Sequence, residues 1–187
     1  MLSIKTNHTL MNILKFDFRI DWVTTVLDSL ESAFQQIEEK GSDQPWFDGL
    51  FQIEHAEAVF GVAFVIAQTY VLGTLQDVNG IRKSAKKKQL SKIEFYSDAT
   101  HCNDTSTSTI NLINATANYY KHNDEWGNTW PNNLTTKTLA DVGIDSNTEF
   151  PCYRAGIILF GEKHVWQFSL LREMITDWRK HVLSKYV

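Results

Sequence analysis

Cysteine and proline are scarce in this sequence, and each shortage narrows the class of protein. Two cysteines, Cys102 and Cys152, are too few for a disulfide-stapled scaffold and predict reduced thiols in a cytoplasmic protein. Together with His101 and His164 they lack the close Cys-X-X-Cys spacing of a zinc site, so no metal is predicted there. Only three prolines and nine glycines interrupt the chain, which leaves room for long helices.

Positive charge is not in excess either. The formal net charge is −4 and the isoelectric point is about 5.8, which argues against a surface built entirely for nucleic acid. A local basic patch stays compatible with this balance, because the field at a site depends on where the charges lie. Hydrophobic residues make up 43% and charged residues 21%, as in soluble globular proteins, so one folded domain over residues 1–187 is predicted.

No apolar run is long enough to predict a membrane span or a signal peptide. The longest run, residues 58–73, falls short of the roughly 20 apolar residues that a span needs, and Gln68 interrupts it. Polar side chains also break up the N-terminal stretch, at Lys5, His8, Lys15 and Asp17. We therefore expect a cytoplasmic protein that does not contact a membrane.

The spacing of apolar side chains is helical over most of the chain. Residues 21–41, 110–122 and 164–187 each show an apolar stripe with a period of three to four residues. Residues 46–78 are apolar on nearly every side, which is typical of the central helix of a bundle. Residues 152–161 fit either a strand or the first turns of the last helix. The pattern predicts an all-α helical bundle of four to five helices with irregular loops.

A basic run follows the predicted central helix. Five positive side chains fall within seven residues, at Arg82, Lys83, Lys86, Lys87 and Lys88. Such a run can hold the phosphates of a nucleic acid, with binding that weakens steeply as salt is added. The alternative is a solvated loop that keeps the protein soluble, which the lack of interleaved aromatic residues favours.

Residues 117–126, ANYYKHNDEW, place polar and basic side chains at the end of the predicted third helix. This stretch resembles the signature of HEPN domains, the all-α bundles of prokaryotic toxins, CRISPR ribonucleases and defence proteins. Their signature is an arginine, a polar residue and, several residues later, a histidine on one helix. His122 matches that histidine and Asn118 the polar residue, whereas Ala117 stands where the family has arginine.

The resemblance implies a homodimer that binds RNA through its paired helices, without a metal or another cofactor. It implies His122 as the general acid or base, Asn118 as its orienting neighbour and Lys121 as the phosphate contact, although lysine lacks the bidentate fork of arginine. The expected function is a metal-independent ribonuclease or a non-catalytic, RNA- or nucleotide-binding relative of one. The alternative for His122 is a helix end at which the ring meets the negative pole of the helix dipole.

Two further functions suit other side chains near this stretch. Tyr119, Trp126 and Trp130 are predicted to contact a partner or ligand, which fits a non-enzymatic dimeric interaction module. Helix-borne carboxylates fit a metal-dependent nucleotide hydrolase instead, with ligands at Glu54, Glu57, Asp124 and Glu125. The sequence lacks a second Glu-X-X-Asp pair, so solvated or salt-bridged carboxylates are the preferred interpretation.

Overall fold

A computed structural model describes residues 16–41, 44, 49–126 and 129–187, and 73% of these residues are helical. The α-helices in this part of the chain are α2 (Ile20–Gly41), α3 (Gly49–Ser84), α4 (Lys92–Tyr96), α5 (Thr109–His122), α6 (Leu134–Asp141), α7 (Pro151–Phe160) and α8 (Phe168–Tyr186). Two 3₁₀ helices join them, η1 (Asn123–Glu125) and η2 (Glu162–His164). The predicted all-α class is confirmed, whereas the predicted count of four to five helices is wrong, because seven α-helices form within the described residues.

The helices that raise the count are short and begin at local capping signals. At α4, the Ser91 side chain accepts a hydrogen bond from the Glu94 N–H, and the Glu94 carboxylate accepts one from the Ser91 N–H. Asn133 caps α6 in a similar way. Residues 152–161 form neither a strand nor the start of the last helix. They belong to α7, which begins with a proline in its first turn and ends at Gly161, whose φ of 77° suits a residue without a Cβ.

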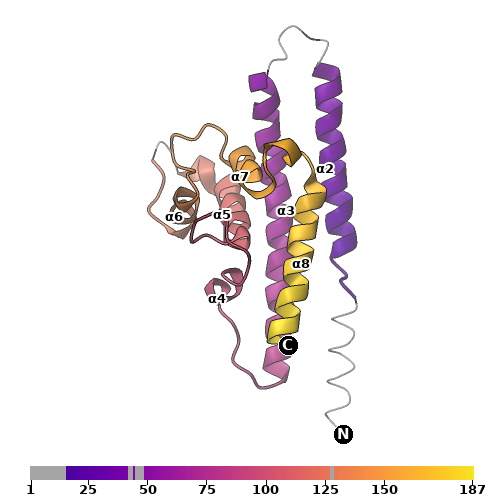
Figure 1. Ribbon diagram of the computed structural model, residues 1–187, viewed down its shortest axis with the longest axis vertical. Helices are drawn as coiled ribbons and strands as arrows, with labels where there is room; N and C mark the ends of the chain where they lie inside the picture. The colour runs from indigo at the N-terminus through magenta and orange to yellow at the C-terminus, as the bar shows by residue number, and fades with distance from the viewer. Residues whose placement is uncertain (1–15, 42–43, 45–48, 127–128) are drawn as a thin grey trace.

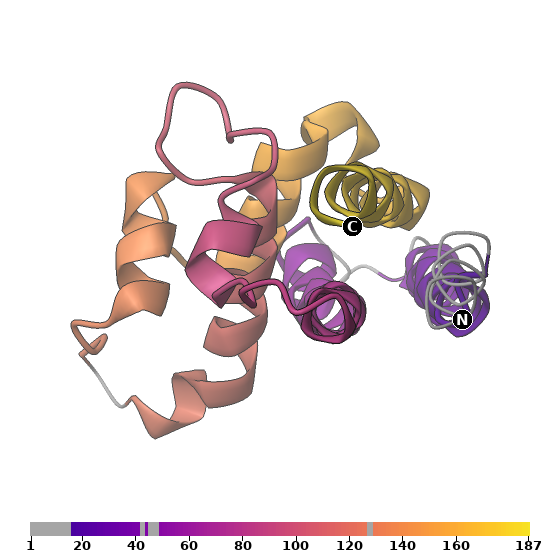
Figure 2. The ribbon, with the colours of Figure 1, turned by 90° about the horizontal axis from the view of Figure 1, so that it is seen from below.

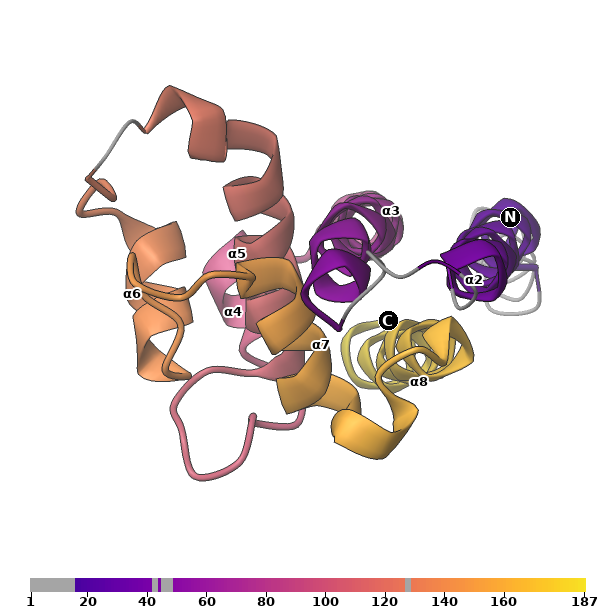
Figure 3. The same ribbon diagram turned by 90° about the horizontal axis from the view of Figure 1, so that it is seen from above.

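Figure 1 shows α3 running along the length of the molecule, with α2 and α8 beside it and the shorter helices on its other side. Figures 2 and 3 look along α3 from its two ends and show the same division, with α4, α5 and α6 opposite α2. The core lies along α3, where ring and aliphatic side chains such as Phe60, Phe64 and Val71 are 0% exposed. This confirms the predicted central helix over residues 49–78; the helix continues to Ser84, and residues 46–48 of the prediction lie outside the described residues.

By length and composition, α3 is the one helix in the described part of the chain that could cross a membrane. About three fifths of its most apolar window (61%) is buried inside the protein by the other helices. A central core helix shows the same apolar character, because neighbouring helices cover it on most sides.

The contact between α3 and α5 depends on a glycine. A Cβ placed on Gly61 would lie 2.0 Å from a ring carbon of Tyr120. That separation is far inside van der Waals contact, so only glycine lets the two helices approach this closely here. The approach brings the polar residues of α5 against α3.

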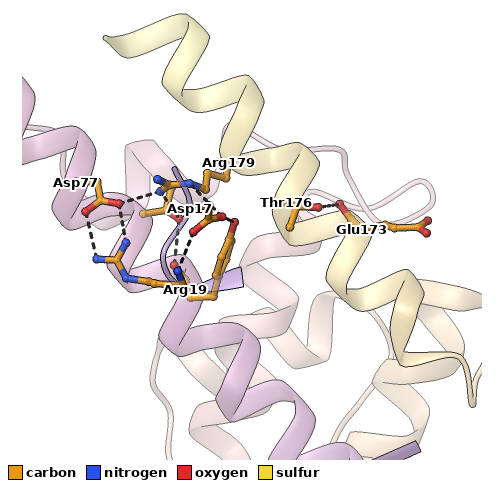
Figure 4. Close-up of polar contacts among 8 residues, drawn as sticks. Asp17, Arg19, Asp77, Glu173, Thr176 and Arg179 are labelled. Carbon is orange, nitrogen blue, oxygen red and sulfur yellow. Dashed lines mark hydrogen bonds and ion pairs between the residues drawn. The ribbon is translucent and has the colours of Figure 1, made fainter. Parts of the chain in front are cut away.

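A network of charged side chains joins the residues just before α2, the C-terminal half of α3 and α8 (Figure 4). Arg179 is 5% exposed, and its guanidinium lies 3.3 Å from Asp17 Oδ2 and 2.9 Å from Asp77 Oδ2. Arg19 donates to both oxygens of Asp77, and the Tyr70 hydroxyl donates to Asp17. Two guanidinium groups therefore face two carboxylates, and the charges balance inside the fold.

Candidate functional site

The helix that carries ANYYKHNDEW begins at a cap and buries one stripe. The Ser108 side chain accepts a hydrogen bond from the Asn111 N–H at the start of α5. Ile110, Ile113 and Ala117 are 0% exposed and face the core. Asn114, Asn118 and Lys121 form a neighbouring polar stripe, since residues three and four apart share a helix face. This stripe contacts α3.

Three side chains of that polar stripe converge on one glutamine of α3, and we call this group the Gln68 cluster (Gln68, Asn114, Asn118 and Lys121). The Gln68 amide nitrogen donates to the side-chain oxygens of Asn114 and Asn118, each at 2.9 Å. Its oxygen accepts a hydrogen bond from Lys121 Nζ at 2.8 Å. Gln68 is 5% exposed, so these bonds satisfy an amide that would otherwise be buried without partners.

The structure thus brings together two of the three residues that the resemblance implies as catalytic. Asn118 and Lys121 meet at Gln68, whereas the His122 ring has Glu125 as its partner, with Nδ1 and Oε1 3.0 Å apart. The side chains of His122 and Glu125 are 48% and 70% exposed. Ala117, at the position of the family's arginine, is buried in the core.

Lys121 is exposed, and its surroundings lower its pKa. Burial of part of the side chain lowers its pKa, and the positive charge of Lys92 lowers the pKa further. Lys92 lies in the first turn of α4, so this helix brings a second cation to the Gln68 cluster. Sequence reasoning missed both Gln68 and Lys92. The only signal for Gln68 was a polar residue within an apolar run.

Arg82, the first residue of the basic run, joins the run to the C-terminal end of α8. Arg82 Nε donates to the Lys88 carbonyl at 2.7 Å, and its Nη1 donates to the Tyr186 carbonyl at 3.1 Å. The guanidinium also lies over the Tyr186 ring, 5.9 Å from its centroid. Four lysines of the predicted phosphate-binding run remain exposed, at Lys83, Lys86, Lys87 and Lys88.

The helix α4 lies between the basic run and the Gln68 cluster. Its Glu94 carboxylate has a lowered pKa, first because of hydrogen bonds from Ser91 and then because of the nearby charges of Lys88 and Arg82. At the same helix, Lys92 lies close to Lys121. We call this series of cations, Arg82, Lys88, Lys92 and Lys121, the basic track. Arg82 follows Gln68 by 14 residues on α3, so the track is about 21 Å long at 1.5 Å per residue.

The three aromatic residues predicted to contact a partner form a group of their own around the C-terminal end of α5. Tyr119 and Trp130 have ring centroids 5.2 Å apart, and Trp126 lies 5.7 Å from each of them. At these distances the rings pack on one another and leave no space between them for a stacked base. Burial, followed by the charge of Glu57, raises the pKa of Tyr119 to about 12.

Two of the four carboxylates proposed as metal ligands, Glu57 and Glu125, have other partners. The two oxygens of Glu57 accept hydrogen bonds from the backbone N–H groups of Cys152 and Tyr153, both at 2.9 Å, at the start of α7. Burial nevertheless raises the pKa of Glu57. Glu125 pairs with His122. Within the described residues, no three His, Cys, Asp or Glu side chains are grouped so that they could hold a metal ion.

Comparison of the whole chain with protein-family models, with curated proteins and with solved structures found no match. The geometry of the basic track and of the Gln68 cluster is therefore the basis for inferring a function.

Proposed function

We propose that this protein is an RNA-binding helical module, a non-catalytic relative of HEPN domains, which holds RNA phosphates along the basic track. The observation that carries the proposal is the position of Lys92 between the basic run and Lys121. Helix α4 thereby links two candidate sites that lie more than 30 residues apart in the sequence. A track of about 21 Å is long enough for several consecutive phosphates of a single strand.

The Gln68 cluster holds the side chain of Lys121, which is one end of the basic track, in a fixed position. A free lysine side chain loses rotamer entropy when it binds a phosphate, by up to about 2 kcal/mol. Lys121 is already held by the Gln68 oxygen, so less of that entropy remains to be lost. A phosphate oxygen is also a stronger acceptor for an ammonium group than a neutral amide oxygen, because it carries charge.

Binding without cleavage fits the other two residues of the signature. Ala117 cannot stabilise charge on a phosphate, and it is 0% exposed in the core. His122 is paired with Glu125 beside the track and does not belong to the Gln68 cluster. We expect His122→Ala to leave RNA binding unchanged and the RNA intact in both proteins.

The test is the salt dependence of binding to a fluorescently labelled single-stranded RNA, followed by anisotropy from about 50 mM to about 200 mM salt. Each lost phosphate contact lowers the slope of log affinity against log salt by about 0.7 for a single strand. We expect this loss for Lys121→Ala and for Lys92→Ala. Lys137→Ala, an exposed lysine of α6 outside the track, is the matched control and keeps the wild-type slope. The proposal would be refuted if wild type and the three variants had equal slopes, or if the affinity did not change with salt concentration.

A further inference from the structure

An open cavity of about 890 Å³ adjoins Asp98, the residue that Lys185 contacts. It is lined by residues 97–103 after α4, by Thr109 at the start of α5, by the end of α7 and by one face of α8. Its apolar wall includes Ile158, Met174 and Trp178, and its polar wall includes Asp98 and His181. Its volume falls in the range of small-molecule sites, which are mostly apolar with a few placed polar groups.

The polar wall is built around one carboxylate. Asp98 Oδ1 lies 2.8 Å from Lys185 Nζ and 3.3 Å from His181 Nε2. The Trp178 indole N–H donates to the Asp98 carbonyl at 3.0 Å and fixes the backbone. Burial alone would raise the pKa of Asp98, but hydrogen bonds from Lys185, Tyr186 and His181 lower it below its usual value, so the carboxyl is ionised at neutral pH.

An ionised Asp98 selects the tautomer of the neutral His181 ring. A carboxylate only accepts hydrogen bonds, so Nε2 carries the proton that points to Asp98 and Nδ1 keeps its lone pair. Nδ1 has no hydrogen-bond partner among the residues that the structure describes, and the side chain is 54% exposed. His181 therefore offers an acceptor to a ligand N–H or O–H group.

The charges around the cavity balance, which favours an uncharged ligand. Lys185 offsets Asp98, and Lys180 lies 2.8 Å from the other carboxylate of the wall, Asp177. A ligand with an apolar body and an N–H donor at its edge matches the apolar wall and the His181 acceptor. The bases of RNA are uncharged heterocycles of this kind.

The cavity is also connected to the basic track. Lys185 contacts its wall at Asp98, and the next residue, Tyr186, accepts a hydrogen bond from Arg82 through its carbonyl. Arg82 of the track and Asp98 of the cavity wall thus contact neighbouring residues of α8. We propose that the cavity receives one unstacked base of the bound RNA and that His181 accepts a hydrogen bond from it. This inference rests on the proposed RNA-binding function.

The test uses free nucleosides (adenosine, guanosine, cytidine and uridine) as well as the labelled RNA, so that the cavity and the track are probed separately. Binding of nucleosides is followed by the NMR shifts of their own base protons, which can be recorded with every variant. Met174→Trp fills the cavity, and His181→Phe keeps a ring but removes the acceptor at an exposed position that tolerates the change. Each variant should weaken nucleoside binding at least about tenfold and weaken RNA binding without changing its salt slope.

The outcomes separate this inference from the proposed function. Lys92→Ala should lower the salt slope for RNA and leave nucleoside binding unchanged. If no nucleoside binds, or if both cavity variants bind nucleosides like wild type, the base site is refuted even where salt-dependent RNA binding persists. If nucleosides bind and both cavity variants weaken that binding, but RNA does not bind, the cavity is supported as a nucleoside site and the RNA-binding function is refuted.

Discussion

At the scale of single residues, Glu57 is the clearest case of a charge held inside the fold for a structural purpose. The first N–H groups of a helix have no partner within it, and those of Cys152 and Tyr153 find theirs in the Glu57 carboxylate. The negative charge also suits the positive pole of the α7 dipole. Glu57 therefore joins α3 to α7 across 95 residues of sequence.

Glu57→Ala should destabilise the protein by about 2 to 5 kcal/mol, because it leaves two backbone donors buried without an acceptor and opens a cavity. Unfolding in urea measures the change. Glu54→Ala, at an exposed position on the same helix, should stay within about 0.5 kcal/mol of wild type. A Glu57 variant as stable as the Glu54 variant would show that the cap contributes nothing.

The same carboxyl gives a dependence on pH. Burial raises the folded-state pKa of Glu57 above its ordinary value of 4.5, so its contribution to stability is complete below that value. The contribution falls as pH rises through the raised pKa. The difference in unfolding free energy between wild type and Glu57→Ala should thus be largest on the acid side and narrow with rising pH. A difference that widens with pH would contradict this sign.

Residue roles could be read from the sequence only where partners lie close along the chain. Asn118 and Lys121 were singled out because they share a helix with His122, and their common partner was not seen. That partner, Gln68, lies 50 residues away on a helix whose apolar pattern suggested only core packing. Its polarity inside an apolar run was a signal for a buried contact, but the identity of the contact needs the fold.

At the scale of elements, the long helices were predictable and the short ones were not. A period of three to four residues needs several turns to become visible, and α4 has five residues. The sequence nevertheless contains a signal for the start of α4, since Ser91 and Glu94 have the spacing of a capping box. Pro151 and Gly161 marked the two ends of α7 in the same way.

Ser91→Ala should loosen α4 and thereby the middle of the basic track. Loss of a serine cap costs about 1 kcal/mol, and the Lys92 backbone follows directly in the first helical turn. Hydrogen exchange at the α4 amides should become faster, and RNA binding should weaken. Ser84→Ala removes a hydroxyl that is bonded within α3 and caps nothing, so both measurements should stay at wild-type values. Unchanged exchange in Ser91→Ala would rule out the capping role.

At the scale of the whole molecule, the charged network ties the three longest helices at one place. Arg179 on α8 contacts Asp77 on α3 and Asp17 before α2, over sequence separations that no periodicity reveals. The sequence predicted the apolar faces that bring these helices together. It did not predict the network, because every charged side chain in it also fits a solvated helix surface.

Arg179→Met tests how far this network fixes the packing of α2, α3 and α8. Removing one partner of a buried ion pair leaves charge uncompensated and costs about 3 to 5 kcal/mol. Asp17 and Asp77 keep 22% and 21% of their side-chain surface exposed, so water offsets part of this, and we expect about 3 kcal/mol. Adding Asp17→Asn to Arg179→Met should restore part of the loss, because Asp17 is the carboxylate that loses its cation, whereas Asp77 keeps Arg19. Arg172→Met, on the same helix and 3.7 Å from the exposed Asp28, should cost less than about 1 kcal/mol by urea unfolding. Equal losses for the two arginine variants would mean that the network adds no more than an ordinary surface pair, and that apolar packing alone aligns the three helices.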